Sequence, residues 1–185
     1  MNTEKRLRLL QLVRNLAYRE GEFTLRSGEK SRFYLDGKQV TMRAEGAALF
    51  AELILDKLAD TGVLAIGGPT LGADPIVGAV SALSFHRGQP LAALIVRGEE
   101  KDHGTGKLVE GPQLPPGSSV AVVEDVVTRG GAVMHAIHAL EAAGYRVEHV
   151  LCLVDRQSTG GDLLRSAGYR FDPIFTLEEV TSAVL

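Results

Sequence analysis

The sequence lacks three features that would place it in other classes of protein. No apolar run approaches the ~20 residues that a membrane-spanning helix needs, and the N-terminus MNTEKRLRLL has no continuous apolar core like that of a signal peptide. Cys152 is the single cysteine, so no internal disulfide can form, and we expect it to be an inert core thiol. The net charge is −3, so no global basic field draws the chain to nucleic acid or to a membrane. We therefore expect a cytoplasmic protein with neither of those partners.

What is present indicates one α/β domain over 1–185. Continuous apolar segments alternate with helical patterns along most of the chain, which is typical of βαβ units around a parallel sheet. Residues 21–37 carry a hairpin signal, and the long polar segment 97–117 is of a kind that is usually either a functional lid or disordered. We expect strands over 63–68, 91–96, 120–125, 147–155 and 171–175, and helices over 3–19 (with Thr3 as N-cap), 43–60, 72–87 and 130–143.

One stretch, VAVVEDVVTRGGA (120–132), combines adjacent acids with a turn almost free of side chains. In open α/β sheets, ligands bind at the carboxyl ends of the strands, and the next helix offers unpaired amides that suit phosphate. Thr128 can donate a hydroxyl, and Gly130 and Gly131 let the backbone approach closely. Glu124 and Asp125 would repel a phosphate, so they must serve hydroxyls, a cation or developing positive charge beside it. The stretch therefore indicates a site for a phosphorylated sugar.

Other phosphate motifs are missing from the sequence. The dinucleotide fingerprint GxGxxG is absent at this turn, and GxxxxGK[ST] is absent from the chain, since GTGKL (104–108) matches only its end. A solvated strand end with an ordinary glycine turn is the plain alternative. A generic sugar-phosphate enzyme is another, but it leaves the basic residues of 97–117 without a role. His135 and His138 share a helix face without a third metal ligand nearby, so we expect both to be solvated.

The stretch resembles the signature of the type I phosphoribosyltransferases, which bind phosphoribosyl diphosphate (PRPP). The resemblance implies that 128–132 hold the 5′-phosphate. It also implies that Glu124 and Asp125 contact the ribose hydroxyls and stabilise a cation-like transition state, with Asp125 as a catalytic residue. Magnesium would arrive on the diphosphate, without a direct protein ligand and with both carboxylates in its second shell. GGPTLGADP (67–75) resembles the turn that cradles the diphosphate. The implied PRPP residues of the signature are Glu124, Asp125, Val126, Val127, Thr128, Arg129, Gly130, Gly131 and Ala132.

Three further stretches resemble the orotate phosphoribosyltransferases within that family. They are FTLRSGEKSRFYLD (23–36), RGEEKDHGTG (97–106) and LVDRQSTGG (153–161), in the family's order along nearly the whole chain. Orotate carries a carboxylate, and a guanidinium fork binds a carboxylate through two parallel hydrogen bonds. Arg156 follows a strand end and could supply that fork, although Asp155–Arg156 could also be a plain ion pair. The resemblance implies orotate contacts from Arg26, the backbones of Tyr34 and Leu35, Thr128 and Arg156.

The resemblance also implies a role for the polar loop, which is to bind the diphosphate of PRPP. The leaving diphosphate is strongly anionic, and Arg97, Lys101 and His103 lie on a segment long enough to fold over it. The resemblance implies that all three bind PRPP and that Lys101 and His103 are catalytic. It also implies a homodimer in which the loop 97–107 is shared across subunits. The implied fold is α/β, with a Rossmann-like parallel-sheet core (41–185, with a mobile loop at 97–117) and a small N-terminal hood (1–40) containing a β-hairpin.

Two positions depart from the family pattern. Many members have a lysine after the loop arginine and another in the turn after the first core strand, where this chain has Gly98 and Gly72. Glu124 replaces the usual first aspartate of the signature and keeps its charge. The main expectation is transfer of the phosphoribosyl group of PRPP to orotate, a step of pyrimidine synthesis. Two alternatives stay open: a PRPP-binding regulator without turnover, and a related transferase that uses another nucleobase.

Overall fold

A computed structural model describes residues 3–24, 30–99 and 107–183. Its centre is a six-stranded sheet in the order β5-β4-β3-β6-β7-β8, parallel except for β5, which pairs antiparallel with β4. The strands are β3 (Ala65–Pro69), β4 (Ala92–Val96), β5 (Val109–Glu110), β6 (Ser119–Val127), β7 (Arg146–Asp155) and β8 (Arg170–Thr176). The predicted parallel α/β core is therefore present.

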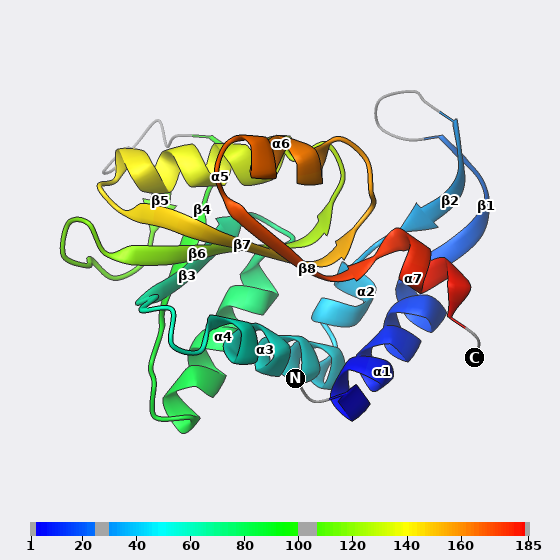
Figure 1. Ribbon diagram of the computed structural model, residues 1–185, viewed down its shortest axis with the longest axis horizontal. Helices are drawn as coiled ribbons and strands as arrows, with labels where there is room; N and C mark the ends of the chain where they lie inside the picture. Colours follow the sequence, from blue (N-terminus) through cyan, green and yellow to red (C-terminus); the bar gives the residue numbers. More distant parts are fainter. Residues whose placement is uncertain (1–2, 25–29, 100–106, 184–185) are drawn as a thin grey trace.

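Helices cover both faces of this sheet (Figure 1). α3 (Ala44–Leu58) and α4 (Asp74–His86) lie on one face, and α5 (Gly131–Ala142) and α6 (Gly160–Ser166) lie on the other. Successive residues of β6 supply the two cores in turn: Val120 and Val122 pack with α5, whereas Ala121 and Val123 pack with α3 and α4. This alternation explains why the strand reads as a continuous apolar run, since both of its faces are buried.

The position of the site follows from the strand order. β3 has β4 on one side and β6 on the other, so the chain reverses its direction of winding between β3 and β6. The turns that follow these two strands, 70–73 and 128–130, therefore flank the crevice at the carboxyl ends where open α/β sheets bind ligands. Both turns were predicted from the sequence as phosphate-binding segments.

The N-terminal segment differs from the prediction of one helix over 3–19. α1 covers Thr3–Leu12 with Thr3 inside it rather than as its N-cap, and a π-helical turn, η1 (Val13–Ala17), follows. Tyr18 already belongs to strand β1 (Tyr18–Thr24), which pairs antiparallel with β2 (Lys30–Leu35). The helix ends early because residue 18 pairs with Leu35 and because the Asp36 amide donates to the Ala17 carbonyl at 3.0 Å.

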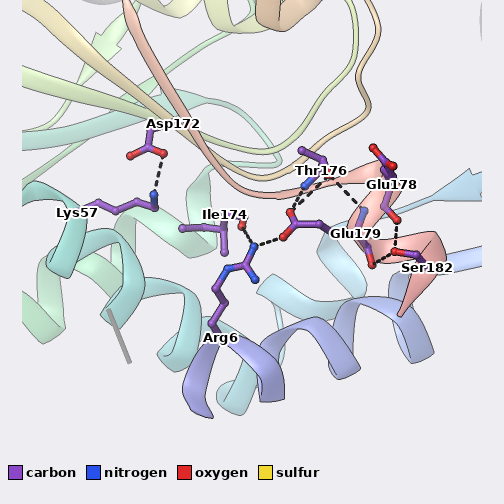
Figure 2. Close-up of polar contacts among 8 residues, drawn as sticks. All are labelled: Arg6, Lys57, Asp172, Ile174, Thr176, Glu178, Glu179 and Ser182. Atoms are coloured by element: carbon purple, nitrogen blue, oxygen red, sulfur yellow. Dashed lines mark hydrogen bonds and ion pairs between the residues drawn. The ribbon is translucent and has the colours of Figure 1, made fainter. Parts of the chain in front are cut away.

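Two short helices were not expected from the sequence. α2 (Lys38–Thr41) connects the hairpin to α3, and α7 (Leu177–Ser182) follows β8 with a capping box between Thr176 and Glu179. Figure 2 shows Arg6 of α1 reaching both the Ile174 carbonyl and the Glu179 carboxylate, while Lys57 of α3 pairs with Asp172. The Arg6–Glu179 contact joins α1 to α7, and the other two contacts join α1 and α3 to β8.

Two predicted strand limits also change. β6 continues to Val127 instead of ending at Asp125, because residues 126 and 127 still pair with Val154 and Asp155 of β7. The segment 97–117 is not loop throughout, since Val109 and Glu110 add strand β5 to the edge of the sheet. The Arg97 amide donates to the Leu108 carbonyl at 2.9 Å, so the two ends of the polar loop leave the sheet side by side.

We predict that Gly46→Ala destabilises the fold by about 1–3 kcal/mol, because overpacking at a close contact forces the backbone to shift. A Cβ at position 46 would meet the Val40 carbonyl oxygen and lie 2.6 Å from its Cγ1, so α3 and α2 would separate. Thermal unfolding measures this as about 2–4 °C of Tm for each kcal/mol. The control is Gly78→Ala in α4, where a Cβ meets nothing within 4 Å. It should leave Tm unchanged or raise it, and equal losses in both variants would contradict the argument.

Candidate active site

The centre of the site is a buried pair of carboxylates near the end of β6. Glu124 and Asp125 are each only 7% exposed. A Cβ at Gly72, in the turn after β3, would meet Glu124 Oε1 and lie 2.6 Å from Asp125 Oδ1, so both carboxylates converge on that turn. Each bonds to the next backbone amide: Asp125 N donates to Glu124 Oε1 at 3.0 Å, and Val126 N donates to Asp125 Oδ1 at 2.9 Å. The two acids are therefore held by their own strand.

The pair holds a proton at neutral pH in the absence of a ligand. Burial, with the charge of Asp125 as the next cause, raises the pKa of Glu124 to about 9. Burial and mutual repulsion both disfavour a state in which the two neighbouring carboxylates are charged at the same time. A ligand that brings hydroxyl groups or positive charge to the pair would stabilise its charged form and so lower the pKa of Glu124.

A lysine from outside the sheet lies against the acid pair. Lys38 of α2 places its Nζ 3.5 Å from Asp125 Oδ2 and 2.9 Å from Asp36 Oδ1. Burial opposes its charge, but the hydrogen bond to Asp36 and the charge of Asp125 prevail and raise the pKa of Lys38. The approach needs Gly37, since a Cβ there would lie 2.8 Å from the Cβ of Asp125. Sequence reasoning missed Lys38, because no local pattern reveals that this lysine pairs with Asp125 of β6.

The predicted phosphate turn has the backbone geometry that anion binding needs. α5 begins at Gly131, directly after Gly130 at φ +79°, a conformation that favours glycine. The first amides of a helix have no partner within it, so those of α5 are available to an anion. The turn is braced from α6, where the Gly160 amide donates to the Thr128 carbonyl at 2.9 Å. Arg129, Gly131 and Ala132 are exposed and Thr128 is half-buried, so a ligand can reach this turn.

Two further signature residues, Val126 and Val127, lie in β6 with the acid pair rather than in the turn. Val127 is 1% exposed and packs in the core under α5, while Val126 is half-buried. The Val127 carbonyl accepts the Arg156 amide at 2.9 Å. These valines were predicted to bind PRPP, but the Val127 side chain faces the core, so only its backbone could take part.

Arg156 lies one strand away from the acid pair, directly after β7. Its guanidinium stacks over the Phe33 ring, with Cζ 4.7 Å from the ring centroid, and burial lowers its pKa. In the described part of the chain no carboxylate forms an ion pair with it, and the neighbouring Asp155 instead accepts from the Gln157 amide at 2.9 Å. The alternative of a plain Asp155–Arg156 pair is therefore wrong. A partly dehydrated guanidinium next to the phosphate turn suits an anionic ligand.

The hairpin places two residues that were predicted to bind orotate, Tyr34 and Leu35, on a strand beside Arg156. Phe33, which lies under Arg156, precedes Tyr34 and Leu35 on β2. Tyr34 is 44% exposed, with its ring against Phe23 at 5.5 Å, whereas the Leu35 side chain is buried. Both residues were expected to contact orotate through their backbones, and the strand that carries them lies beside Arg156.

Arg97 lies away from the acid pair of its own chain. It follows β4, which is separated from β6 by β3, and its guanidinium is 3.7 Å from the Glu110 carboxylate. His135 was expected to be solvated, but it is half-buried and its Nε2 lies 3.0 Å from the Arg97 carbonyl oxygen. That prediction was wrong because the base of the polar loop packs against α5. Arg26, Lys101 and His103 fall outside the described residues.

The described residues contain no ready-made metal cage. Over 3–24, 30–99 and 107–183, no three or more histidine, cysteine or acidic side chains gather in a group that could hold a metal ion. In the same ranges, no helix is both long enough and apolar enough to span a membrane. Cys152 is fully buried, and burial raises the pKa of its thiol, which keeps the thiol protonated.

Comparison with known proteins decides the family. An orotate phosphoribosyltransferase from Nostoc is 48% identical over 176 residues, covering 95% of this chain and 84% of the relative. The chain belongs to the orotate phosphoribosyltransferase family. A Synechocystis member is 49% identical over 172 residues, covering 93% and 86%. The Mycobacterium tuberculosis orotate phosphoribosyltransferase in complex with PRPP superposes with a TM-score of 0.80 at 32% identity, covering 96% of this chain and 99% of that one. No protein-family model matches.

These likenesses confirm the main predictions from the sequence. The family, the type I phosphoribosyltransferase fold with an N-terminal hairpin, and the class of transferase are as expected. The residue roles, magnesium and the homodimer stay predictions. So does the division into a hood over 1–40 and a core over 41–185.

We predict that Glu124→Gln is increasingly stabilising as the pH rises from 5 to 9. The folded protein binds a proton on Glu124 up to about pH 9, and the unfolded chain releases it near the ordinary value of 4.5. The stability due to that proton is complete below the unfolded pKa and is lost as the pH rises toward the folded one. The glutamine amide stays neutral over this whole range. As the pH rises, the Tm of the parent protein should therefore fall relative to that of the variant. The exposed Glu22→Gln serves as the control, and a Tm difference that does not change with pH would refute the buried proton.

Proposed function

We propose that the chain transfers the phosphoribosyl group of PRPP to orotate, which gives orotidine 5′-phosphate and diphosphate. One observation carries the proposal: the glycine turn predicted to bind phosphate, a buried acid pair and a guanidinium that pairs with no carboxylate of the described residues lie at the carboxyl ends of adjacent strands β6 and β7. The relatives bear the name of this activity, and the M. tuberculosis relative is known in complex with PRPP. The pathway is pyrimidine synthesis.

PRPP would bind along the signature. The amides of 129–132 and the Thr128 hydroxyl would hold the 5′-phosphate, and the turn at 70–73 would hold the diphosphate, with the acid pair between them on the ribose hydroxyls. The close approach of Gly72 to both carboxylates supports this arrangement, because it leaves a backbone surface rather than side chains on that side of the acids. The charge of the pair would favour positive charge on the ribose ring.

Magnesium fits this site as a companion of the diphosphate. At the end of β6 the carboxylates are those of Glu124, whose pKa is raised by burial, and Asp125, which faces Lys38. Magnesium keeps several of its waters in proteins and is commonly bound through substrate phosphates plus one or two carboxylates. Glu124 and Asp125 would therefore act through water. The metal would supply neutralisation of the leaving diphosphate.

The chemistry is a substitution at the ribose C1. Orotate N1 forms the new bond on the face opposite to the departing diphosphate, so the configuration inverts, and the ribose carries cation-like charge in between. Arg156 would hold the orotate carboxylate in place by its guanidinium fork. Orotate ionised at N1 needs no general base, and we assign none.

The leaving diphosphate would be covered by the polar loop of a second subunit. Arg97 faces Glu110 and lies two strands from the acid pair within its own chain, which supports a role in another chain's site. Lys101 and His103 would neutralise or protonate the diphosphate as it leaves. We therefore propose a homodimer that exchanges the loops 97–107.

We predict that Arg156→Ala raises the KM for orotate roughly 10- to 100-fold, because hydrogen bonds to charged groups contribute about 1.5–3 kcal/mol. The KM for PRPP should change little. Depletion of orotate in the presence of PRPP and magnesium, followed by absorbance, measures both. The matched control is Arg165→Ala, which removes an exposed arginine of α6 that also lies over an aromatic ring, that of Phe171. Equal changes in both KM values would remove Arg156 from the orotate site. PRPP binding without product in the parent protein would favour the regulator.

We predict that Lys101→Ala lowers kcat, and that mixing it with Arg156→Ala restores activity. In a heterodimer with exchanged loops, one site carries both defects and the other carries none. Assayed with orotate near the parent KM, where Arg156→Ala is nearly inactive, equal mixing after dissociation should therefore recover roughly a quarter of the parent activity, since half of the dimers are mixed. Proven heterodimers that stay as inactive as the separate variants would show that each subunit uses its own loop.

A further inference from the structure

Arg156 is one end of a continuous stack of four side chains. Its Cζ lies 4.7 Å from the centroid of the Phe33 ring. That ring stacks on Tyr18 with centroids 5.9 Å apart and an interplanar angle of 24°. On Tyr18 lies Arg14, with its Cζ 4.6 Å from the ring centroid. Three successive contacts thus link two guanidinium groups through two aromatic rings, in the order Arg14–Tyr18–Phe33–Arg156.

The stack joins the N-terminal segment to the end of β7. Arg14 belongs to η1, Tyr18 begins β1, Phe33 lies on β2, and Arg156 follows Asp155. Tyr18 is 8% exposed and packs in the main core, against which the half-buried Phe33 also packs. The ring that Arg156 contacts is therefore held by the core, while the exposed Tyr34 side chain is on the opposite face of β2.

Stacking on a ring leaves the arginine free to bind a carboxylate. A cation–π contact uses the flat face of the guanidinium, whereas its N–H groups point outward in the plane and form the fork that binds a carboxylate. The two interactions do not compete. The long arginine side chain loses rotamer freedom when it binds a ligand, and a ring that already holds the plane reduces that loss.

We propose that Phe33 is a positioning residue for Arg156: its ring sets the plane of the guanidinium in which the carboxylate of the nucleobase substrate is bound. The inference rests on the proposed role of Arg156. It adds a residue that touches no substrate and that acts only on the affinity for the base. Tyr18 stacks on this ring, and Arg14 lies over Tyr18 in turn.

The test compares Phe33→Leu with Phe33→Tyr in the full-length enzyme. Leucine keeps an apolar side chain but removes the ring, so the KM for orotate should rise roughly two- to tenfold, the size of one cation–π contact. The KM for PRPP should stay within twofold, and tyrosine should restore the parent value. In an Arg156→Ala background, Phe33→Leu should add nothing further. Phe23→Leu removes the other aromatic ring of β1, which contacts Tyr34, and controls for loosening of the hairpin.

A second variant keeps the test valid if leucine unfolds the hairpin. Trifluorinated phenylalanine at position 33 keeps the shape of the ring and weakens its negative face, so the KM for orotate should again rise while Tm is unchanged. If Arg156→Ala raises the KM for orotate but the ring variants do not, the positioning role is wrong and the proposed function stands. If Arg156→Ala itself leaves this KM unchanged, both the carboxylate site and the positioning role fall.

Discussion

The site depends on two carboxylates kept out of water at the point where the sheet reverses its winding. Glu124 and Asp125 can be this dry only because glycine backbones approach them from two sides, Gly72 after β3 and Gly37 before α2. Their mutual repulsion is relieved by a retained proton and by Lys38. With that proton the pair carries less than two full charges, and the remaining charge acts strongly because the surroundings have a low dielectric.

The core of the fold was predictable because its strands are buried on both faces. Such strands read as unbroken apolar runs, and all five long strands of the main sheet were located within a few residues. The N-terminal segment was harder, since its helical period continues past the point where Tyr18 pairs with Leu35. Helix α2 has four residues and no period, so only its packing against α3 through Gly46 reveals it.

The candidate site could be predicted where its residues are consecutive. The acids and the phosphate turn form one strand-to-helix stretch, and their order in the chain places them together. Lys38 and Phe33 reach the site only through tertiary contacts, with Asp125 and Arg156 respectively. Neither residue lies in a recognisable motif, because a single contact between distant segments produces no pattern in the sequence. His135 was misjudged for the same reason, as its partner is a backbone carbonyl 38 residues away.

The N-terminal segment therefore does more than cover the site. It supplies Lys38 to the acid pair and the ring beneath Arg156, so it reaches both the proposed sugar end and the proposed base end. The family pattern would place a lysine where this chain has Gly72, but the carboxylates of Glu124 and Asp125 fill the space in which a Cβ would start. A side chain at 72 would have to displace them. The cation at the acid pair then comes from α2, so the seating of α2 on α3 sets the charge at the centre of the site.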